Sequence, residues 1–262
     1  HNLLSSVMDN SIHFDNPLDI DLENITWRRT IDLCVRQLRN CEVGLGSKFD
    51  GFAHKTGFDI VAASEIMTIM ALAQDMADLR ERIGRIVVAY NRSNKPVFAR
   101  ELNCVGSMCV ILRDALQPNL VQTTEHTPVF IHCGPFGNIA HGCNSVRATR
   151  LSLKLAPYVI TEAGFAADLG AEKFLHIKCR QADLTPSAGV LVATVRALKY
   201  HGGIEKEALG IENVKAVRIG CANLQTHAEN VQKYGIPVVI ALNRFPTDTP
   251  AELDALQEFC AS

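Results

Sequence analysis

The fold is decided by two nearby stretches, PVFIHCGPFGNIAHGCNSV (residues 128–146) and YVITEAGFAADLG (residues 158–170). In each stretch, a short run rich in β-branched residues leads directly into polar, glycine-rich residues. The first is then followed by a helical pattern over residues 139–155. In open α/β sheets, ligands bind outside the carboxyl ends of the strands. We therefore expect two adjacent strand ends, at 129–132 and 158–162, whose Gly, His, Asn, Glu and Asp residues form a site.

The later strands support an α/β class. Strands are expected over 189–195 and 237–242, and their central residues, 190–193 and 238–242, are apolar throughout. A helical pattern over 221–234 separates them. Strands that are buried on both faces of a sheet have this composition. The chain is therefore predicted to be an α/β protein with a mainly parallel β-sheet flanked by helices. Residues 121–262 form its α/β part, which carries the substrate-site loops.

Residues 1–120 are predicted to be a helix-rich part with a short β segment. Apolar periodicity predicts helices over 24–40 and 59–83, the second beginning near Ser64 and closing at Gly84. The remaining elements expected here are strands over 85–90 and 97–98 and a helix over 104–116. Helical patterns also reach both ends of the chain, which predicts an internal piece of a longer protein.

Composition excludes several classes of function. A net charge of -2 gives no reason to expect nucleic acid as a partner. No apolar run reaches the length of a membrane span, and the N-terminal residues lack the pattern of a signal peptide. The nine cysteines include no CxxC pair, which favours free thiols in a reducing cytoplasm. Cys133, Cys143, His132 and His141 lie close in sequence but lack zinc-ligand spacing, so no metal site is expected.

The glycine-rich loop at 134–142 is the best candidate for anion binding. The chain has no Walker A motif, and the nearest approach, at 44–48, is most simply an ordinary turn. At 134–142, glycines stand where a strand gives way to a helix, and free N–H groups at a helix start favour an anion. This loop is equally well explained as a cradle for phosphate or an oxyanion and as a tight turn.

The second loop, which follows residue 160, allows two interpretations. Gly164 would let the backbone approach a ligand, and Phe165 could cover that ligand. Glu162 and Asp168 could hold a metal-bound water or could cap a helix. The basic residues that follow suit a phosphate-bearing substrate, although each one alone is more often a surface cation; they are Lys173, Lys178 and Arg180.

One further aromatic residue stands at the end of the last expected strand. Phe245 precedes Pro246, which holds its backbone extended. Its ring could stack on a flat ligand. A core aromatic at a turn is the slightly favoured alternative.

Six segments together resemble the formate–tetrahydrofolate ligase family. They are FDIVAASEIM (58–67), LRDALQPNLVQT (112–123), HCGPFGNIAHGCNS (132–145), TEAGFAADLGAEKF (161–174), VATVRALKYHGG (192–203) and IPVVIALNRFPTDT (236–249). The resemblance implies ligation of formate to tetrahydrofolate with MgATP through formyl phosphate. It also implies a monovalent cation, a homo-oligomer, and a P-loop-NTPase-like core within a larger multi-domain chain. Residues 1–262 would be an internal fragment of the catalytic region.

The resemblance also implies roles for individual residues. Gly164, Phe165 and Gly137 would line the formyl phosphate and nucleotide site, with His132 among the catalytic residues. Phe245 and Pro246 would contact the pterin. The remaining substrate-binding residues would be Asn138, Glu162, Asp168 and Arg180.

The chain departs from the family pattern in two ways. Val61, Cys133 and Gly137 stand where members usually carry Thr or Ser, Gly, and Ala. The phosphate-binding loop, the catalytic Arg and a second stacking Trp are not present, so the chain is expected to be incomplete for catalysis. A non-catalytic folate- or nucleotide-binding module, or an incomplete subunit, is the alternative. A generic oxidoreductase is disfavoured because no G-x-G-x-x-G follows a strand.

Overall fold

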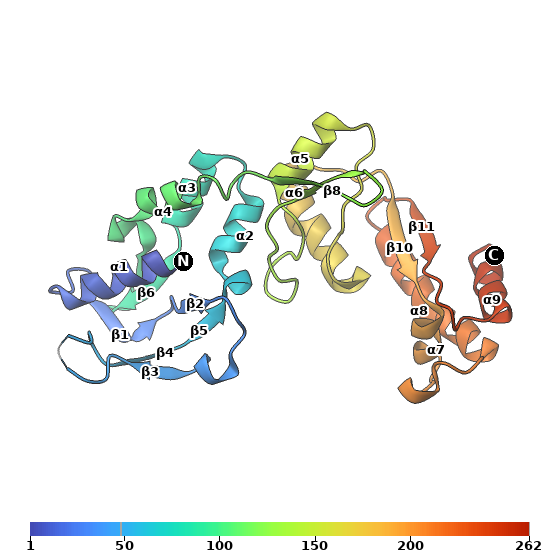
Figure 1. Cartoon of the computed structure of the whole chain (residues 1–262), viewed down its shortest axis with the longest axis horizontal. Helices are drawn as coiled ribbons and strands as arrows, with labels where there is room; N and C mark the ends of the chain where they lie inside the picture. Colours follow the sequence, from blue (N-terminus) through green and yellow to red (C-terminus); the bar gives the residue numbers. More distant parts are fainter. Residues whose placement is uncertain (48, 262) are drawn as a thin grey trace. The chain divides into compact units, whose positions relative to one another are not determined.

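The computed structural model describes residues 1–47 and 49–261 and shows a mixed α/β protein with small sheets (Figure 1). The chain forms two compact units. Unit 1 comprises residues 1–164 and 173–182, and unit 2 comprises 165–172 and 183–262. The boundary expected between residues 120 and 121 falls within β8, inside unit 1, and stays a prediction about the organisation of the chain.

The first half of unit 1 packs helices against an antiparallel sheet of order β1-β6-β7. The strands are β1 (Ile20–Ile25), β6 (Val87–Asn91) and β7 (Pro96–Phe98). The helices are α1 (Asn2–His13), α2 (Glu65–Leu72), α3 (Met76–Gly84) and α4 (Val105–Leu112). The core between them is formed by fully buried aliphatic side chains, among them Leu4, Met8, Ile20, Leu79, Ile83 and Val88.

The helix expected over residues 24–40 is wrong. This segment contains the end of β1, then β2 (Arg29–Ile31) and a short turn, η1 (Arg36–Leu38). The backbone N–H groups of Thr26 and Trp27 donate to Val88 of β6 instead of to the preceding turn. The apolar spacing therefore reflects strand pairing, which competes successfully with a helix in this β-branched segment.

Further small strands pair along the same region of the chain. β2 runs parallel to β5 (Phe58–Ile60), and β3 (Cys41–Val43) runs antiparallel to β4 (His54–Thr56). The region up to residue 120 is therefore richer in β structure than the sequence predicts.

The helix expected over 59–83 is divided into α2 and α3. Its predicted ends are confirmed, because Ser64 caps α2 by accepting from the N–H of Ile66 and α3 ends at Gly84. The division arises at Asp75, whose carboxylate accepts from the N–H of Asp78 and starts a new helix. A capping aspartate inside an apolar pattern is a recognisable signal for such a break.

The second half of unit 1 carries the predicted glycine-rich loop. β8 (Asn119–Gln122) pairs antiparallel with β9 (Pro128–Ile131), and α5 (Val146–Leu155) follows after the loop. The helix expected over 139–155 begins only at Val146, because Ser145 accepts from the N–H of Ala148 and caps α5 there. Two short helices complete this half, η5 (Phe174–Cys179) and α6 (Arg180–Ala182).

The strand expected over 158–162 is wrong. Residues 156–164 form neither helix nor strand. The side chains of Tyr158 and Ile160 are 89% and 97% exposed, so the β-branched run has neither a buried face nor a partner strand among the described residues. The expected pair of adjacent strand ends is accordingly not formed, and β9 alone leads into a candidate loop.

Unit 2 is built on one parallel strand pair. β10 (Gly189–Ala193) and β11 (Val238–Leu242) align from Gly189 opposite Val238 to Ala193 opposite Leu242. The helices are α7 (Val195–His201), α8 (Val214–Gln232) and α9 (Pro250–Ala261), with the short turns η4 (Ala166–Ala171) and η6 (Lys206–Ala208). Buried Val195, Leu198, Val217, Cys221, Leu224 and Leu256 form its core.

Glycines allow α7 and α8 to pack at close range. A Cβ at Gly220 would lie 2.0 Å from the carbonyl oxygen of Leu198, and one at Gly202 would lie 2.1 Å from that of Ala216. The segment VATVRALKYHGG therefore has a packing role in the structure.

The described strands form several small sheets of both kinds. β10–β11 and β2–β5 are parallel, whereas β1–β6, β6–β7, β3–β4 and β8–β9 are antiparallel. These pairs establish the mixed α/β class and do not confirm a mainly parallel sheet. Across residues 1–47 and 49–261, none of the helices combines the length and the apolarity needed to cross a membrane.

Candidate functional site

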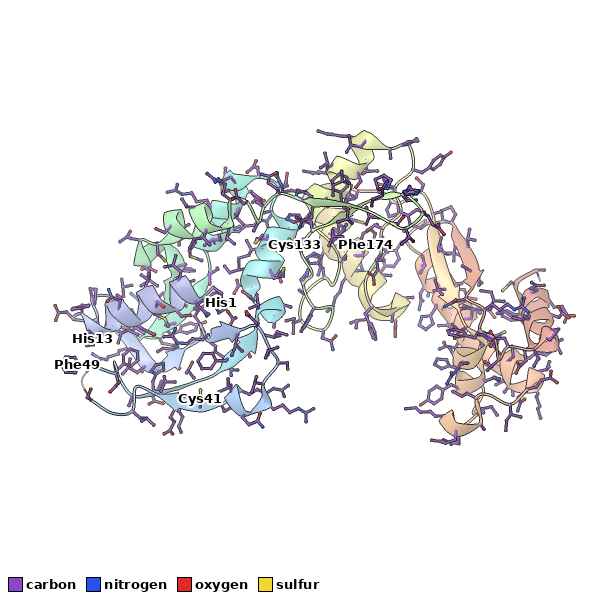
Figure 2. The ribbon with its side chains drawn as sticks, viewed as in Figure 1. His1, His13, Cys41, Phe49, Cys133 and Phe174 are labelled. Carbon is purple, nitrogen blue, oxygen red and sulfur yellow. The ribbon has the colours of Figure 1, made fainter. Side chains whose placement is uncertain are left out.

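The loop after β9 folds back on itself. Cys133, which directly follows His132 at the end of β9 (Figure 2), has a left-handed backbone with φ 59°. Gly142 has φ 70°, and a Cβ there would lie 2.7 Å from the Cα of Gly137. Only glycine permits this close approach at position 142, so the loop's shape depends on that residue.

His132 joins β9 to α5. It is buried, with Nδ1 2.6 Å from Ser145 Oγ and Nε2 2.8 Å from the carbonyl oxygen of Ala115. A carbonyl only accepts, so Nε2 carries the proton and Nδ1 accepts from the hydroxyl of Ser145. Burial lowers the pKa of His132, against the opposing effect of the Ala115 hydrogen bond, and Arg147 lowers it further. Both ring nitrogens are thus occupied in holding the fold, and the predicted catalytic role stays a prediction.

Lys173 fixes the middle of the loop. Its ammonium group donates to the carbonyl oxygens of Gly137 and Ala140, the second at 3.0 Å. Asn138, between these two residues, is exposed. The structure therefore brings Gly137 and Asn138 together with Lys173, which the sequence suggested only as a general partner for phosphate.

A second basic group lies behind the same loop. Lys178 is fully buried, and its ammonium group donates to Oδ1 of Asn144. His141 is also fully buried, and neither of its ring nitrogens has a hydrogen-bond partner among the described residues. Burial lowers the pKa of His141 to about 4, and the charges of Lys178 and Lys173 act in the same direction. Sequence reasoning considered His141 only as a zinc ligand, and no local pattern indicated its burial.

The second candidate loop lies where the chain passes from unit 1 to unit 2. Gly164 has φ 93°, a left-handed backbone conformation that favours glycine. Phe165, the next residue, is 72% exposed. Glu162, Asp168 and Arg180 are not buried, and none forms an ion pair within the described part of the chain. The N-cap of η4 is Phe165, which makes no side-chain cap bond.

In unit 2, Phe245 follows β11 in a tight turn. The carboxylate of Asp248 accepts from the N–H of Phe245 at 2.8 Å, and the N–H of Asp248 donates back to the carbonyl of Phe245 at 3.0 Å. Phe245 is 38% exposed, and Pro246 is exposed beside it. Asp248 is buried, and its Oδ1 has no partner among the described residues. Sequence reasoning missed Asp248, whose carboxylate reaches back to a backbone N–H three residues earlier, as the acidic residue of a capping box does.

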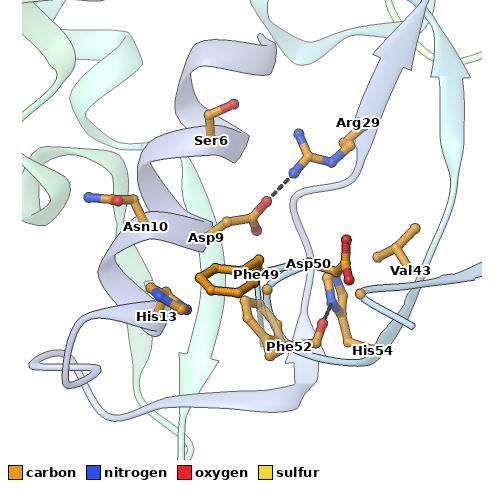
Figure 3. A pocket seen from close by; sticks show the side chains of 12 residues that line it. Ser6, Asp9, Asn10, His13, Arg29, Val43, Phe49, Asp50, Phe52 and His54 are labelled. Carbon is orange, nitrogen blue, oxygen red and sulfur yellow. Dashed lines mark hydrogen bonds and ion pairs between the residues drawn. The ribbon is translucent and has the colours of Figure 1, made fainter. Parts of the chain in front are cut away.

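A pocket of unit 1 lies away from these loops (Figure 3). It has a volume of about 370 Å³ and lies between α1 and the segment 43–54. Asp9 pairs with Arg29 on one side, and Phe52 stacks on His54 at 4.5 Å on another. No predicted site residue lines it. A second pocket of about 270 Å³ is lined by Phe136 of the glycine-rich loop together with Ile60 and Ala63.

The described residues contain no group of three or more His, Cys, Asp and Glu side chains arranged to hold a metal ion. The loops instead contain backbone turns that glycine permits, one buried and one partly buried ammonium group, and one exposed aromatic ring at a strand end. The fold and these loops define a mixed α/β protein whose polar sites follow β9 and β11.

Comparisons with known proteins identify the family. The sequence profile described as "Formate--tetrahydrofolate ligase" matches residues 1–262. A protein of that name from Cereibacter sphaeroides is 58% identical over 261 residues, which are 100% of this chain and 47% of the relative. Those from Ruegeria pomeroyi and Mesorhizobium japonicum are 56% and 55% identical over 262 residues, with the same coverage. The chain belongs to the formate–tetrahydrofolate ligase family and spans about half the length of these curated relatives.

Proposed function

We propose that the full-length protein containing this chain ligates formate to tetrahydrofolate with MgATP, giving 10-formyltetrahydrofolate, ADP and phosphate. The family match over all 262 residues carries this proposal. The relatives' names support a ligase over a non-catalytic folate- or nucleotide-binding module.

The reaction proceeds in two balanced steps. A formate oxygen attacks the terminal phosphorus of ATP, the bond to the bridging oxygen breaks, and ADP leaves with formyl phosphate formed. The N10 amine of tetrahydrofolate then attacks the formyl carbon, phosphate leaves with the original formate oxygen, and the nitrogen loses a proton. The first step requires in-line positioning and cations around the phosphoryl group.

The geometry of two loops supports roles for particular residues. Gly137, Asn138, Gly164 and Phe165 are proposed to contact the nucleotide and formyl phosphate. Lys173 holds the loop on either side of Asn138 by donating to the carbonyl oxygens of Gly137 and Ala140. In this account, Gly142 is the position that gives the loop its shape.

The turn after β11 supports a pterin contact. Phe245 is half-exposed beside Pro246 and is held from both sides of its backbone by Asp248. A flat heterocycle can stack on such a ring. Among the described residues, Oδ1 of Asp248 has no partner, and we propose that it accepts from an N–H of the bound ligand. His132, Glu162, Asp168 and Arg180 keep the positioning roles that the resemblance implies.

The finer architecture is also included in the proposal. Val190 and Val192 of β10 and Val239 of β11 are more than half exposed, which supports further strands or helices covering this sheet in the full-length protein. We propose that β10 and β11 belong there to a mainly parallel, P-loop-NTPase-like core. A cytoplasmic homo-oligomer with a bound monovalent cation completes the family-based proposal.

The test is a substrate-omission assay on the purified full-length protein. 10-Formyltetrahydrofolate is expected only when ATP, formate and tetrahydrofolate are all present, with one ADP formed per product. Product formation without ATP, or tetrahydrofolate binding with no product under any condition, would contradict the ligase proposal. The second result would favour the non-catalytic module.

A further inference from the structure

We propose that His141, Lys173 and Lys178 of unit 1 form a binding site for a phosphate-like oxyanion behind the glycine-rich loop. The oxyanion is either free or the phosphoryl group of a nucleotide. The inference goes beyond the ligase reaction, because it rests on charge and hydrogen bonding within unit 1 alone.

The first observation is a buried cation with no counter-charge. Lys178 is fully buried. Among the described residues, its ammonium group meets only the amide oxygen of Asn144 and, at 5.5 Å, the ring of Phe174, which is labelled in Figure 2. Lys199 in unit 2 is equally buried, but it pairs with Glu252 at 2.9 Å. Buried ammonium groups are costly unless an anion balances them. Within the described chain, Lys178 therefore lacks the partner that Lys199 has.

The second observation is a buried imidazole with both nitrogens free among the described residues. Buried polar atoms in folded proteins almost always have a partner, and those without one indicate an absent ligand or water. His141 directly follows Ala140, whose carbonyl accepts from Lys173, and lies three residues before Asn144, whose side chain accepts from Lys178. The charges of both lysines also lower the pKa of His141. The low pKa keeps the ring neutral at pH 7, with one N–H to donate and one nitrogen to accept.

No neighbouring group among the described residues forms an ion pair with either lysine. Burial raises the pKa of Cys143 to about 11 and raises the pKa of Cys179, so both side chains are neutral thiols at pH 7. No carboxylate in the described chain lies within ion-pair distance of Lys173 or Lys178. Glu162, whose charge reaches Cys143, forms no such pair either.

The ligand class follows from this imbalance. Two ammonium groups and a neutral imidazole N–H offer several donors and two positive charges to one small ligand. Lysine binds phosphate as a point charge, and charge-assisted hydrogen bonds of this kind are the strong ones. An oxyanion would form a hydrogen bond with His141 and would also neutralise the positive charge of Lys178. A water molecule could form the hydrogen bond but could not neutralise the charge.

The experiment uses inorganic phosphate and the full-length protein in a buffer free of other oxyanions, without ATP, formate or tetrahydrofolate. Isothermal titration calorimetry should give saturable binding of phosphate. Lys178→Met and Lys173→Met should each weaken it at least about tenfold, the loss expected for one charge-assisted hydrogen bond. Lys154→Met is the matched control, because Lys154 is exposed on α5, and it should leave the affinity unchanged.

A thermal melt checks that the variants fold. Lys178→Met removes a buried charge, so it should fold at least as stably as the wild type. Phosphate should raise the melting temperature of the wild type and of Lys154→Met more than that of Lys178→Met. In crystals soaked with selenate, anomalous scattering should place the selenium beside the ammonium group of Lys178. Selenate found only elsewhere would overturn the site.

Two further results would also overturn the proposal: no saturable phosphate binding, or binding whose affinity is unchanged in both lysine variants. The latter would place phosphate at another site, such as the one proposed for the ligase. Saturating ATP distinguishes the sources: loss of phosphate binding assigns the oxyanion to a nucleotide, and unchanged binding assigns it to a free ion. Since no turnover is measured, an inactive ligase would leave this result intact.

Discussion

Buried polar residues in this chain differ in whether the fold satisfies them. His132 uses both ring nitrogens, and Lys199 has a carboxylate partner. His141 and Lys178 are as deeply buried. Within the described chain, however, the ring of His141 has no hydrogen-bond partner, and the positive charge of Lys178 has no carboxylate partner. The first pair maintains the structure by itself, and the second pair indicates a site for a ligand.

His141 should make stability depend on pH. Its folded pKa of about 4 lies below the usual value of 6.5, so the unfolded chain binds the additional proton between these values. In phosphate-free buffer, the free energy of unfolding should therefore fall as the pH falls from 6.5 to 4, with His141 contributing on the order of 3 kcal/mol. Denaturant titrations at several pH values measure this, and His141→Gln should show a flatter profile.

The matched control for this prediction is His126→Gln, at an exposed position in the turn between β8 and β9. It should keep the wild-type pH profile. Identical profiles for the wild type and His141→Gln would show that His141 is not buried as a neutral ring.

Phe245 should contribute to folate binding. In the full-length enzyme, Phe245→Ala should raise the KM for tetrahydrofolate roughly tenfold, because a stacking surface is lost, and should change kcat less. Steady-state kinetics at saturating ATP and formate measure this split. Phe14→Ala removes another exposed ring, just after α1, and should leave both constants unchanged. Equal effects of the two substitutions would refute the pterin contact.

At the scale of elements, the shape of the glycine-rich loop depends more on Gly142 than on Gly134. Gly142→Ala should destabilise the protein by about 2 kcal/mol, because the left-handed backbone is strained and the new Cβ meets Gly137 at 2.7 Å. Gly134→Ala, in the same loop, meets nothing within 4 Å and should change stability by less than about 0.5 kcal/mol. Chemical denaturation of both variants measures their free energies of unfolding. Equal losses of stability in the two variants would contradict the loop conformation described above.

The buried pair Lys199–Glu252 should tie α7 to α9. Glu252 also accepts from the N–H groups of Asn213 and Thr249, and these bonds hold its pKa below the usual value although burial alone would raise it. Lys199→Met should cost about 3 kcal/mol, because it leaves Glu252 buried and unpaired.

Replacing both members with Met should cost less than the sum of the single changes. The exposed pair Arg218–Glu258 provides the comparison, and Arg218→Ala should cost about 0.5 kcal/mol. Unfolding free energies of the four variants test the pair. Additive losses at Lys199 and Glu252 would show that the two side chains do not interact.

The sequence predicted elements well where the local signal and the packing agree. The sequence predicted the apolar runs of β10 and β11, the cap at Ser64 and the helix end at Gly84, because each depends on neighbouring residues only. Residues 24–40 and 158–162 were misjudged, because an apolar period does not reveal whether a partner strand is present. The predicted start of a helix at residue 139 is wrong, because Ser145 caps α5 and the helix begins only at Val146.

Only some features of the candidate site were predictable. The motifs located the glycine-rich loop and the turn at Phe245, but not the contacts that hold them. Lys173 on carbonyl oxygens, Asp248 on the Phe245 turn and the burial of His141 depend on three-dimensional neighbours that no spacing encodes. Cys133 is instructive: its left-handed φ of 59° explains why glycine suits this position in the family pattern.

At the scale of the whole molecule, two compact units each carry one candidate loop system. Unit 1 holds the glycine-rich loop and the buried lysine Lys178, and unit 2 holds the Phe245 turn. The chain spans 47% of the length of the Cereibacter sphaeroides relative, so the proposed reaction belongs to the full-length protein and is measured there.

The most direct test follows one oxygen atom. Full-length protein is given ATP, tetrahydrofolate and formate labelled with oxygen-18, and the mass of the released phosphate is measured. Transfer through formyl phosphate predicts one labelled oxygen in each phosphate formed alongside 10-formyltetrahydrofolate. Unlabelled phosphate, or no phosphate release that depends on formate, would contradict the account.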